Sequence, residues 1–109
     1  MTTDVCEVVI TAADADWLAR FIRSLVVDRL AAAGHTFSPI SSAYWWADDV
    51  QAHAEARATL HTRVELVPAI VERANLEHPY ELPCVVAVPL IAGNPAYFDW
   101  IRTETTPQG

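Results

Sequence analysis

The sequence predicts an α+β fold of the ferredoxin-like, split βαβ type, in which two helices cover one face of a four-stranded antiparallel sheet. Three observations support it. The hydrophobic patterns follow the order β-α-β-β-α-β, with one further helix at the end. A strict apolar–polar alternation over 50–61 indicates one arm of a long β-hairpin. The 109 residues, 52% of them hydrophobic, suffice for a single domain over 1–109, with about 104–109 as a frayed tail.

The first strand and the first helix are separated by a change of hydrophobic period. Residues 6–11 are a short β-branched run, which predicts a strand. From Asp14 onward, apolar residues recur every three or four positions and predict an amphipathic helix. These residues are Trp17, Leu18, Phe21, Ile22, Leu25, Val26 and Leu30. Thr11 or Asp14 can cap the start, and Gly34 is expected to end the helix because glycine tolerates a left-handed backbone.

The middle of the chain predicts the hairpin. Residues 36–46 carry aromatic and β-branched side chains among serines and threonines, and Pro39 predicts a bulge or an edge there. Asp48 and Asp49 predict the turn. Alanine favours helix, but the alternation over 50–61 would place apolar groups all round a helix and on only one face of a strand. The alternation therefore predicts a long strand.

The second half of the chain predicts helix, loop, strand and helix in turn. Thr62 and Glu65 have the spacing of a capping box, which predicts the start of the second helix. Residues 76–83 predict a stiff polar loop because two prolines restrict it. Residues 84–90 predict a buried strand, and Asn94 followed by a proline predicts the start of the last helix.

Charge and composition exclude several classes of function. Fourteen acidic residues stand against seven basic ones, all arginine, for a formal net charge of -7. This balance argues against binding to nucleic acid or to an anionic membrane surface. The longest apolar stretch, 82–92, is too short to cross a membrane, and the first residues lack the features of a signal peptide, so a cytoplasmic location is expected. Without a glycine-rich phosphate loop or a nucleophile elbow, no enzymatic activity is expected.

The 50–61 strand carries one group of residues that could perform chemistry. His53, Glu55, Arg57 and His61 fall on the same face of this strand. Imidazole and carboxylate are competent ligands of zinc and copper(II), but one strand cannot close a metal site by itself. The alternative is a polar face that contacts solvent or another subunit.

The predicted loop carries a second group, His78, Tyr80 and Glu81. A histidine beside a carboxylate can bind a metal or act as acid and base. The alternative is a structural loop in which His78 caps the end of the preceding helix.

The two cysteines are not expected to form a disulfide. Cys6 and Cys84 begin strands that are antiparallel neighbours in this topology, so they should lie at opposite ends of the pair. Both are expected to be buried as small hydrophobic residues.

Several motifs resemble the CutA family of divalent-cation tolerance proteins. The most specific are HPYELP at 78–83 and AGNPAYFDWI at 92–101, and weaker matches are ITA at 10–12, RLAA at 29–32 and SAYWW at 42–46. The resemblance implies a ferredoxin-like domain that assembles as a homotrimer through edge strands and the long hairpin. It also implies a cytosolic protein of metal tolerance without established enzymatic activity. Some members of the family bind copper, and the architecture is similar to that of the PII signalling proteins.

The sequence departs from the family pattern at four positions. Ala33 and Ile10 stand where family members often carry a cysteine, and Asp49 and His61 stand where they usually carry a lysine. The missing thiols weaken a copper(I) thiolate site and leave imidazole and carboxylate as the available ligands.

The resemblance therefore implies a metal site at His78 and Glu81, which match the family motif directly, with copper or zinc as the expected ion. Weaker candidates for the pocket are Tyr80, which would shape it, and His53, His61 and His35. The alternative is a PII-like trimeric module that binds a small molecule or a partner protein without a metal.

Overall fold

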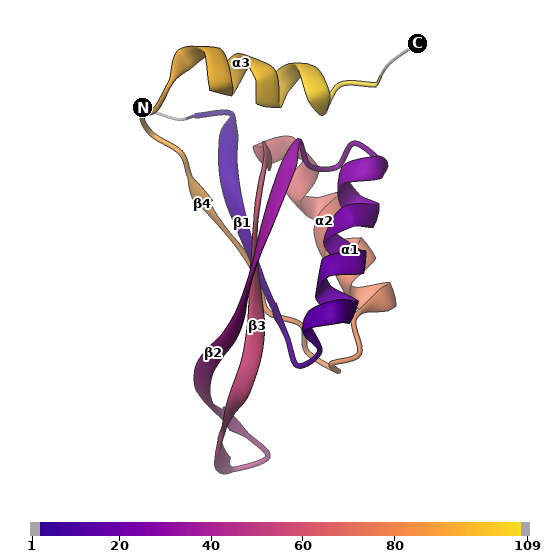
Figure 1. Ribbon diagram of the computed structural model, residues 1–109, viewed down its shortest axis with the longest axis vertical. Coiled ribbons are helices and arrows are strands. Elements are labelled where there is room, and N and C mark those ends of the chain that lie inside the picture. The colour runs from indigo at the N-terminus through magenta and orange to yellow at the C-terminus, as the bar shows by residue number, and fades with distance from the viewer. Residues whose placement is uncertain (1–2, 108–109) are drawn as a thin grey trace.

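The computed structural model describes residues 3–107 and has the predicted α+β architecture. Its four antiparallel strands lie in the order β2-β3-β1-β4 and span β1 Val5–Ala12, β2 Ala33–Trp46, β3 Asp49–Arg63 and β4 Val85–Pro89. The helices are α1 Ala15–Val27, α2 Val67–Glu77 and α3 Pro95–Glu104, with a short 3-10 helix, η1, at Val64–Leu66. Figure 1 shows α1 and α2 on the same side of the sheet, α3 across one end of it, and the β2–β3 hairpin projecting beyond the rest.

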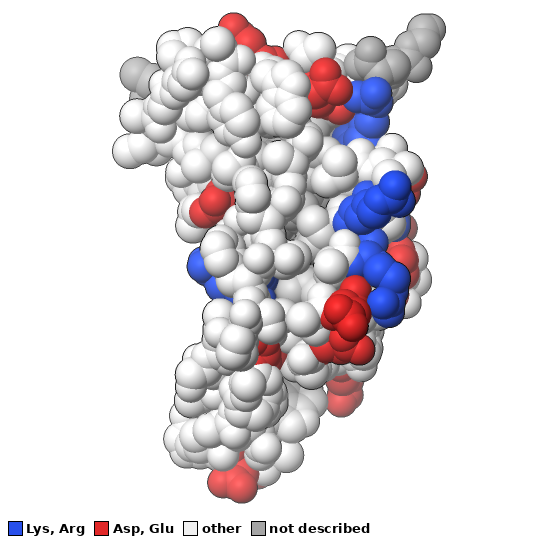
Figure 2. Space-filling model, in the orientation of Figure 1, with Lys and Arg blue, Asp and Glu red and all other residues white. Residues whose placement is uncertain are grey.

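The hydrophobic core lies between the sheet and the helices α1 and α2. Every second residue of β1 is buried against them, as alternation requires of a strand with one covered face. The largest core side chains are Val8, Ile10, Leu18, Phe21, Ile22, Leu25, Leu60 and Ile70. Charged side chains gather over the helical side of the view in Figure 2, whereas most of the projecting hairpin in that view carries none.

Helix α1 begins at a side-chain cap. Asp14 has an extended backbone, and its Oδ1 accepts hydrogen bonds from the backbone N–H groups of Asp16 (2.9 Å) and Trp17 (3.1 Å). These N–H groups have no partner within the helix, so the carboxylate satisfies them and also stabilises the helix dipole. Asp14, one of the two residues predicted to start the helix, is therefore its cap.

Removing this cap is expected to weaken the fold. Asp14→Ala should lower the free energy of unfolding by about 0.5–2 kcal/mol because two helix N–H groups lose their acceptor. Urea denaturation of the variant beside Asp14→Asn, which keeps a side-chain acceptor, measures the effect. Equal losses in both variants would contradict the capping role.

The end of α1 corrects the prediction for Gly34. The helix stops at Val27, and Arg29 takes the left-handed conformation (φ 61°) that a glycine usually supplies. The N–H of Leu30 then donates to the carbonyl of Leu25 over 2.9 Å, which closes the helix end.

Gly34 lies instead within β2, opposite Leu60 of β3. A Cβ atom at this position would come within 2.4 Å of Cγ2 of Ile22 and 2.9 Å of Cδ2 of Leu60. The residue is small because α1 and β3 press against the backbone, and it does not end a helix.

The hairpin confirms the predicted long strands and shifts the turn by one residue. Trp46 pairs with Asp49, so the two turn residues are Ala47 (φ 52°) and Asp48 (φ 64°). Two left-handed residues are typical of the tight turn whose twist matches that of the flanking strands. The predicted irregularity at Pro39 is confirmed, since the register of β2 shifts between Phe37 and Ile40.

The predicted capping box is wrong. The hydroxyl of Thr62 lies in β3 and donates to the carbonyl of Leu30 over 2.6 Å, so it is not available to cap a helix. Neither η1 nor α2 has a side-chain cap. Spacing alone could not show that the strand continues to Arg63 and that Thr62 fastens the loop after α1.

The end of the chain differs from prediction in three respects. Strand β4 was predicted to be buried but is an edge strand, with Val86 and Val88 about half exposed. Both cysteines were predicted to be buried, but only Cys6 is, and Cys84 is exposed. The two cysteines nevertheless lie at opposite ends of the β1–β4 pair, as predicted, because Cys6 pairs with Pro89. Thr105, within the predicted frayed tail, is buried and hydrogen-bonded; residues 108 and 109 lie outside the described residues.

Candidate functional site

A pocket of about 920 Å³ opens between the projecting hairpin and the segment 79–86, which runs from the end of α2 into β4. It lies beyond the point where β1 ends, since Ala12 pairs with Ala56 and the hairpin continues without a further neighbour in the sheet. The residues that line it are Thr11, Ser41, Ser42, Ala43, Tyr44, Trp45, Trp46, Glu55, Pro79, Tyr80, Glu81, Leu82, Pro83, Cys84, Val85 and Val86. Three of the predicted candidate residues, Glu55, Tyr80 and Glu81, are therefore at this pocket.

The carboxylate of Glu55 lies in the wall of the pocket and is only 5% exposed. The phenol of Tyr80 donates a hydrogen bond to its Oε2 atom. His53 Nε2 lies 4.0 Å from the same oxygen and 3.2 Å from the hydroxyl of Tyr44. The predicted polar face of β3 thus exists at its hairpin end, where Glu55, His53 and two tyrosines form one connected group.

His78 holds the start of the loop that lines the pocket. Its ring is 7% exposed, packs edge-on against Trp17 and makes two hydrogen bonds with the backbone. A carbonyl only accepts, so Nε2–H donates to Thr11 O over 2.7 Å; Nδ1 then accepts from the N–H of Tyr80 over 3.0 Å. Both ring nitrogens are occupied in this structure, and they join the backbone of Thr11 to that of Tyr80, the residue before Glu81.

Glu81 is exposed at the pocket and is the third member of the predicted loop group. No hydrogen bond or ion pair joins its side chain to another residue in the described range 3–107. Its carboxylate is therefore accessible to a cation from solvent or from a second copy of the chain.

His61 and His35 lie at the other end of the sheet. His61 is six residues from Glu55 along β3, a separation of about 20 Å. Its Nε2 is 3.0 Å from Glu7 Oε1 and its Nδ1 is 2.6 Å from the Tyr97 hydroxyl, while the His35 ring centroid is 6.1 Å away. The structure therefore separates the predicted histidines into two groups. The bonds of His61 to Glu7 and Tyr97 were not predicted, although alternation places Glu7 on the same uncovered face.

The side chains present set a limit on metal binding by one chain. Among residues 3–107 there is no group of three or more histidine, cysteine, aspartate or glutamate side chains that could hold a metal ion. Burial raises the pKa of the Cys6 thiol, which disfavours the thiolate that a soft metal needs. A divalent cation bound at the pocket would therefore need ligands from outside the chain.

The raised pKa of Tyr80 predicts that the stability of the fold depends on pH in the alkaline range. Burial, followed by the hydrogen bond to Glu55, raises the pKa of Tyr80 well above its usual value of 10.0. A pKa that is higher in the folded than in the unfolded chain stabilises the fold below about pH 10, and this stabilisation is lost as the pH rises further. Urea midpoints measured from about pH 8 to about pH 11 should therefore fall more steeply for the wild type than for Tyr80→Phe. The pKa of Tyr97 is also raised by burial, so some slope should remain in the variant; equal slopes would contradict the prediction.

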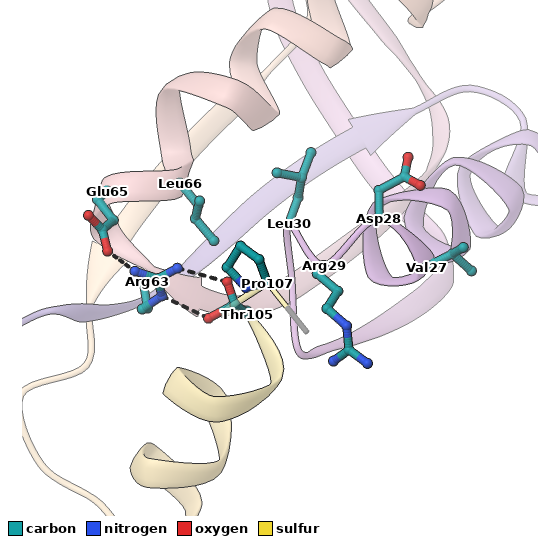
Figure 3. Close-up of a pocket in the computed structure, with 9 residues that line it drawn as sticks. All are labelled: Val27, Asp28, Arg29, Leu30, Arg63, Glu65, Leu66, Thr105 and Pro107. Atoms are coloured by element: carbon teal, nitrogen blue, oxygen red, sulfur yellow. Dashed lines mark hydrogen bonds and ion pairs between the residues drawn. The ribbon is translucent and has the colours of Figure 1, made fainter. Parts of the chain in front are cut away.

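A second hollow, of about 560 Å³, lies beside the ends of α1 and α3. Figure 3 shows Arg63 turned toward Thr105 and Arg29 turned away from it. Arg63 donates to the hydroxyl (2.9 Å) and the carbonyl (2.7 Å) of Thr105, and Arg29 donates to the carbonyl of Glu104 (3.0 Å). Both guanidinium groups bind the end of α3, so this hollow is part of the attachment of that helix.

Comparison with known proteins gives a consistent family match. A family model described as CutA1 divalent ion tolerance protein matches residues 6–104. The divalent-cation tolerance protein CutA of Thermus thermophilus is 35% identical over 100 residues, which cover 91% of this chain and 97% of the relative. The chloroplastic protein CutA 1 of rice is 35% identical over 86 residues, or 79% of this chain and 49% of the relative. The chain thus spans about half the length of some of its relatives.

Solved structures match over nearly the whole chain. CutA1 from Oryza sativa has a TM-score of 0.91 at 31% identity and covers 98% of each chain. CutA from Xylella fastidiosa has a TM-score of 0.90 at 32% identity, covering 95% of this chain and all of the other. The CutA of Archaeoglobus fulgidus, described as a periplasmic divalent cation tolerance protein, has a TM-score of 0.89 at 28% identity and covers 94% of this chain and 99% of the other.

Among the described residues, no helix has the length and apolar character needed to cross a membrane.

Proposed function

The chain belongs to the CutA1 divalent ion tolerance protein family, and we propose that it acts as a homotrimer in the tolerance of divalent metal ions, without enzymatic activity. The observation that carries the proposal is the family match over residues 6–104, and the exposed Glu81 at the pocket supports it. The cytoplasmic location expected from the sequence stays a prediction, because relatives include proteins described as chloroplastic and periplasmic.

Exposed apolar surface supports the assembly. Phe37 is 50% and Val50 51% exposed on the hairpin, and Ile91 is 82% exposed after β4; none of the three lines the pocket. Among residues 3–107, no strand lies along the outer edge of β2 or of β4, so the backbone groups of these edges can pair with another copy. Figure 2 shows the projecting hairpin as a surface with few charged side chains, which suits burial against a second copy despite the net charge of -7.

We place the cation at the pocket, with Glu81 as the ligand that this chain contributes. Glu81 is exposed and lines the same pocket as Glu55, and carboxylate oxygens of both residues are suitable ligands for zinc or copper(II). His78 contributes by positioning the loop, since its ring nitrogens bind Thr11 and Tyr80. The remaining ligands would come from another subunit, and His53, exposed near the pocket, is a candidate for that role. His61 and His35 lie at the other end of the sheet.

Two measurements test the proposal. Light scattering gives the mass of the assembly, and calorimetry then follows the titration of the same protein with copper(II) and with zinc. We expect the mass of three 12.0 kDa chains. We also expect weak cation binding that Glu81→Gln reduces about tenfold, whereas Glu72→Gln, an exposed control on α2, leaves it unchanged. A mass of one chain would contradict the assembly, and equal isotherms for Glu81→Gln and wild type would contradict the assigned ligand.

A second candidate function is a PII-like module that binds a small molecule. The observation that favours it is the size of the pocket, since about 920 Å³ is the volume of an organic ligand site and far exceeds the space that one metal ion needs. Thermal-shift measurements against metals and small molecules separate the two candidates. Stabilisation by metal ions supports the first, and stabilisation by a small molecule in the absence of metal supports the second.

A further inference from the structure

We propose that the pocket between the hairpin and the loop 79–86 binds an organic cation, a flat apolar molecule carrying an amidinium or guanidinium group, with Glu55 as its counter-ion. This rests on the second candidate function, small-molecule binding, and specifies the chemistry of the ligand. The cation's N–H groups would donate to Glu55, and its body would lie among the aromatic side chains.

The placement of Glu55 is the first argument. Its side chain is 95% removed from solvent, and Oε2 accepts the phenol hydrogen of Tyr80. Within the described part of the chain, Oε1 accepts no hydrogen bond, and no fully buried side-chain oxygen lacks a partner, so Oε1 keeps some exposed surface on a residue that lines the pocket. A carboxylate oxygen held in a mostly apolar surrounding gains most from a partner that brings both a positive charge and N–H donors.

The wall of the pocket is the second argument. Tyr44, Trp46 and Tyr80 are among the residues that line it, and the faces of such rings attract cations. Pro79 and Pro83 add flat apolar surface. Of the described residues that form the lining, none is an arginine, lysine or histidine, whereas two are glutamates. The lining therefore selects positive charge, and it has no group to pair with an anion.

A bare metal ion fits these features less well than an organic cation does. Among residues 3–107 no three potential ligands converge, and the aromatic and proline side chains have no role in holding an ion a few ångströms across. A planar amidinium needs only one carboxylate, because two parallel N–H groups can share it, and its apolar body uses the remaining volume.

The experiment titrates the full-length protein, in its native assembly, with benzamidinium and with benzamide, its neutral analogue of nearly the same shape. NMR shifts of the tryptophan indole N–H groups and of the Tyr80 amide report binding. We expect saturable binding of benzamidinium that is about tenfold or more tighter than that of benzamide. Glu55→Gln should remove this preference, whereas Glu72→Gln, with the same change of charge on an exposed helix face, should keep it.

Each outcome decides the proposal. Equal affinity for the two probes would overturn it while leaving a neutral small-molecule site in place. Binding of neither probe would overturn it, including the case in which another copy of the chain fills the pocket, and the thermal-shift measurements then decide the second candidate function separately. Metal binding in calorimetry without benzamidinium binding would overturn it and leave the first proposed function intact. If Glu55→Gln does not fold, the comparison of the two probes on the wild type is still decisive.

Discussion

Gly34→Ala is expected to lower the free energy of unfolding by about 1–3 kcal/mol, a large effect for one methyl group. The new Cβ would lie 2.4 Å from Cγ2 of Ile22 and 2.9 Å from Cδ2 of Leu60, both closer than carbon atoms can approach without movement. Ile22 and Leu60 are buried in the core between α1 and β3, so a shift of either displaces its neighbours. Urea denaturation measures the loss.

A double-mutant cycle identifies the cause. Ile22→Ala removes the Cγ2 atom that the new methyl group would meet, so Gly34→Ala should cost clearly less in that background than in the wild type. Leu18→Ala is the matched control, because it empties a different core position on the same helix. Additive losses in the Ile22 cycle would show that the cost does not come from this contact, which would leave the contact with Leu60 or the backbone of β2 as its source.

The start of α1 could be predicted from the sequence, whereas its end and the role of Gly34 could not. Periodicity predicted α1, and Asp14 predicted its start, because these signals depend on residues close together in the chain. The end of the helix depended on Arg29 adopting a left-handed conformation, which its side chain does not favour and no local pattern reveals. The glycine was required by a contact between α1, β2 and β3, and a single sequence does not contain that contact.

The candidate site divides in the same way. Alternation placed His53, Glu55 and His61 on one face of β3, and the prolines correctly indicated a defined loop at His78 to Glu81. Which of these residues meet depends on where neighbouring strands stop. Because β1 ends opposite Ala56, the loop after α2 can approach the hairpin, and Tyr80 then reaches Glu55. His61, near the other end of β3, contacts Glu7 and Tyr97. Strand ends of this kind are set by tertiary packing and not by local propensity.

His78→Ala is expected to lower the free energy of unfolding by about 2–4 kcal/mol. The substitution leaves the Thr11 carbonyl and the Tyr80 N–H without their partners and empties the space beside Trp17. β4 begins at Val85, opposite Ile10, so it offers no residue to pair with Thr11. Urea denaturation measures the total loss, and hydrogen exchange of the Tyr80 amide reports the loss at the loop.

Two conservative variants and a metal titration separate a positioning residue from a metal ligand. His78→Asn can place an acceptor near Nδ1 and His78→Gln a donor near Nε2, so each should recover part of the stability, and only His78→Asn should protect the Tyr80 amide. The decisive variant is His78→Asn, because it keeps the acceptor for the Tyr80 N–H and so keeps the loop that carries Glu81 in place. Ligand binding stabilises the folded state by mass action, so the loss of a metal ligand makes the difference in stability from the wild type grow with zinc concentration. A loss in His78→Asn that is the same with and without zinc, while the Tyr80 amide stays protected, assigns the imidazole to positioning the loop. A loss that grows with zinc although the amide is protected would assign the imidazole to the metal.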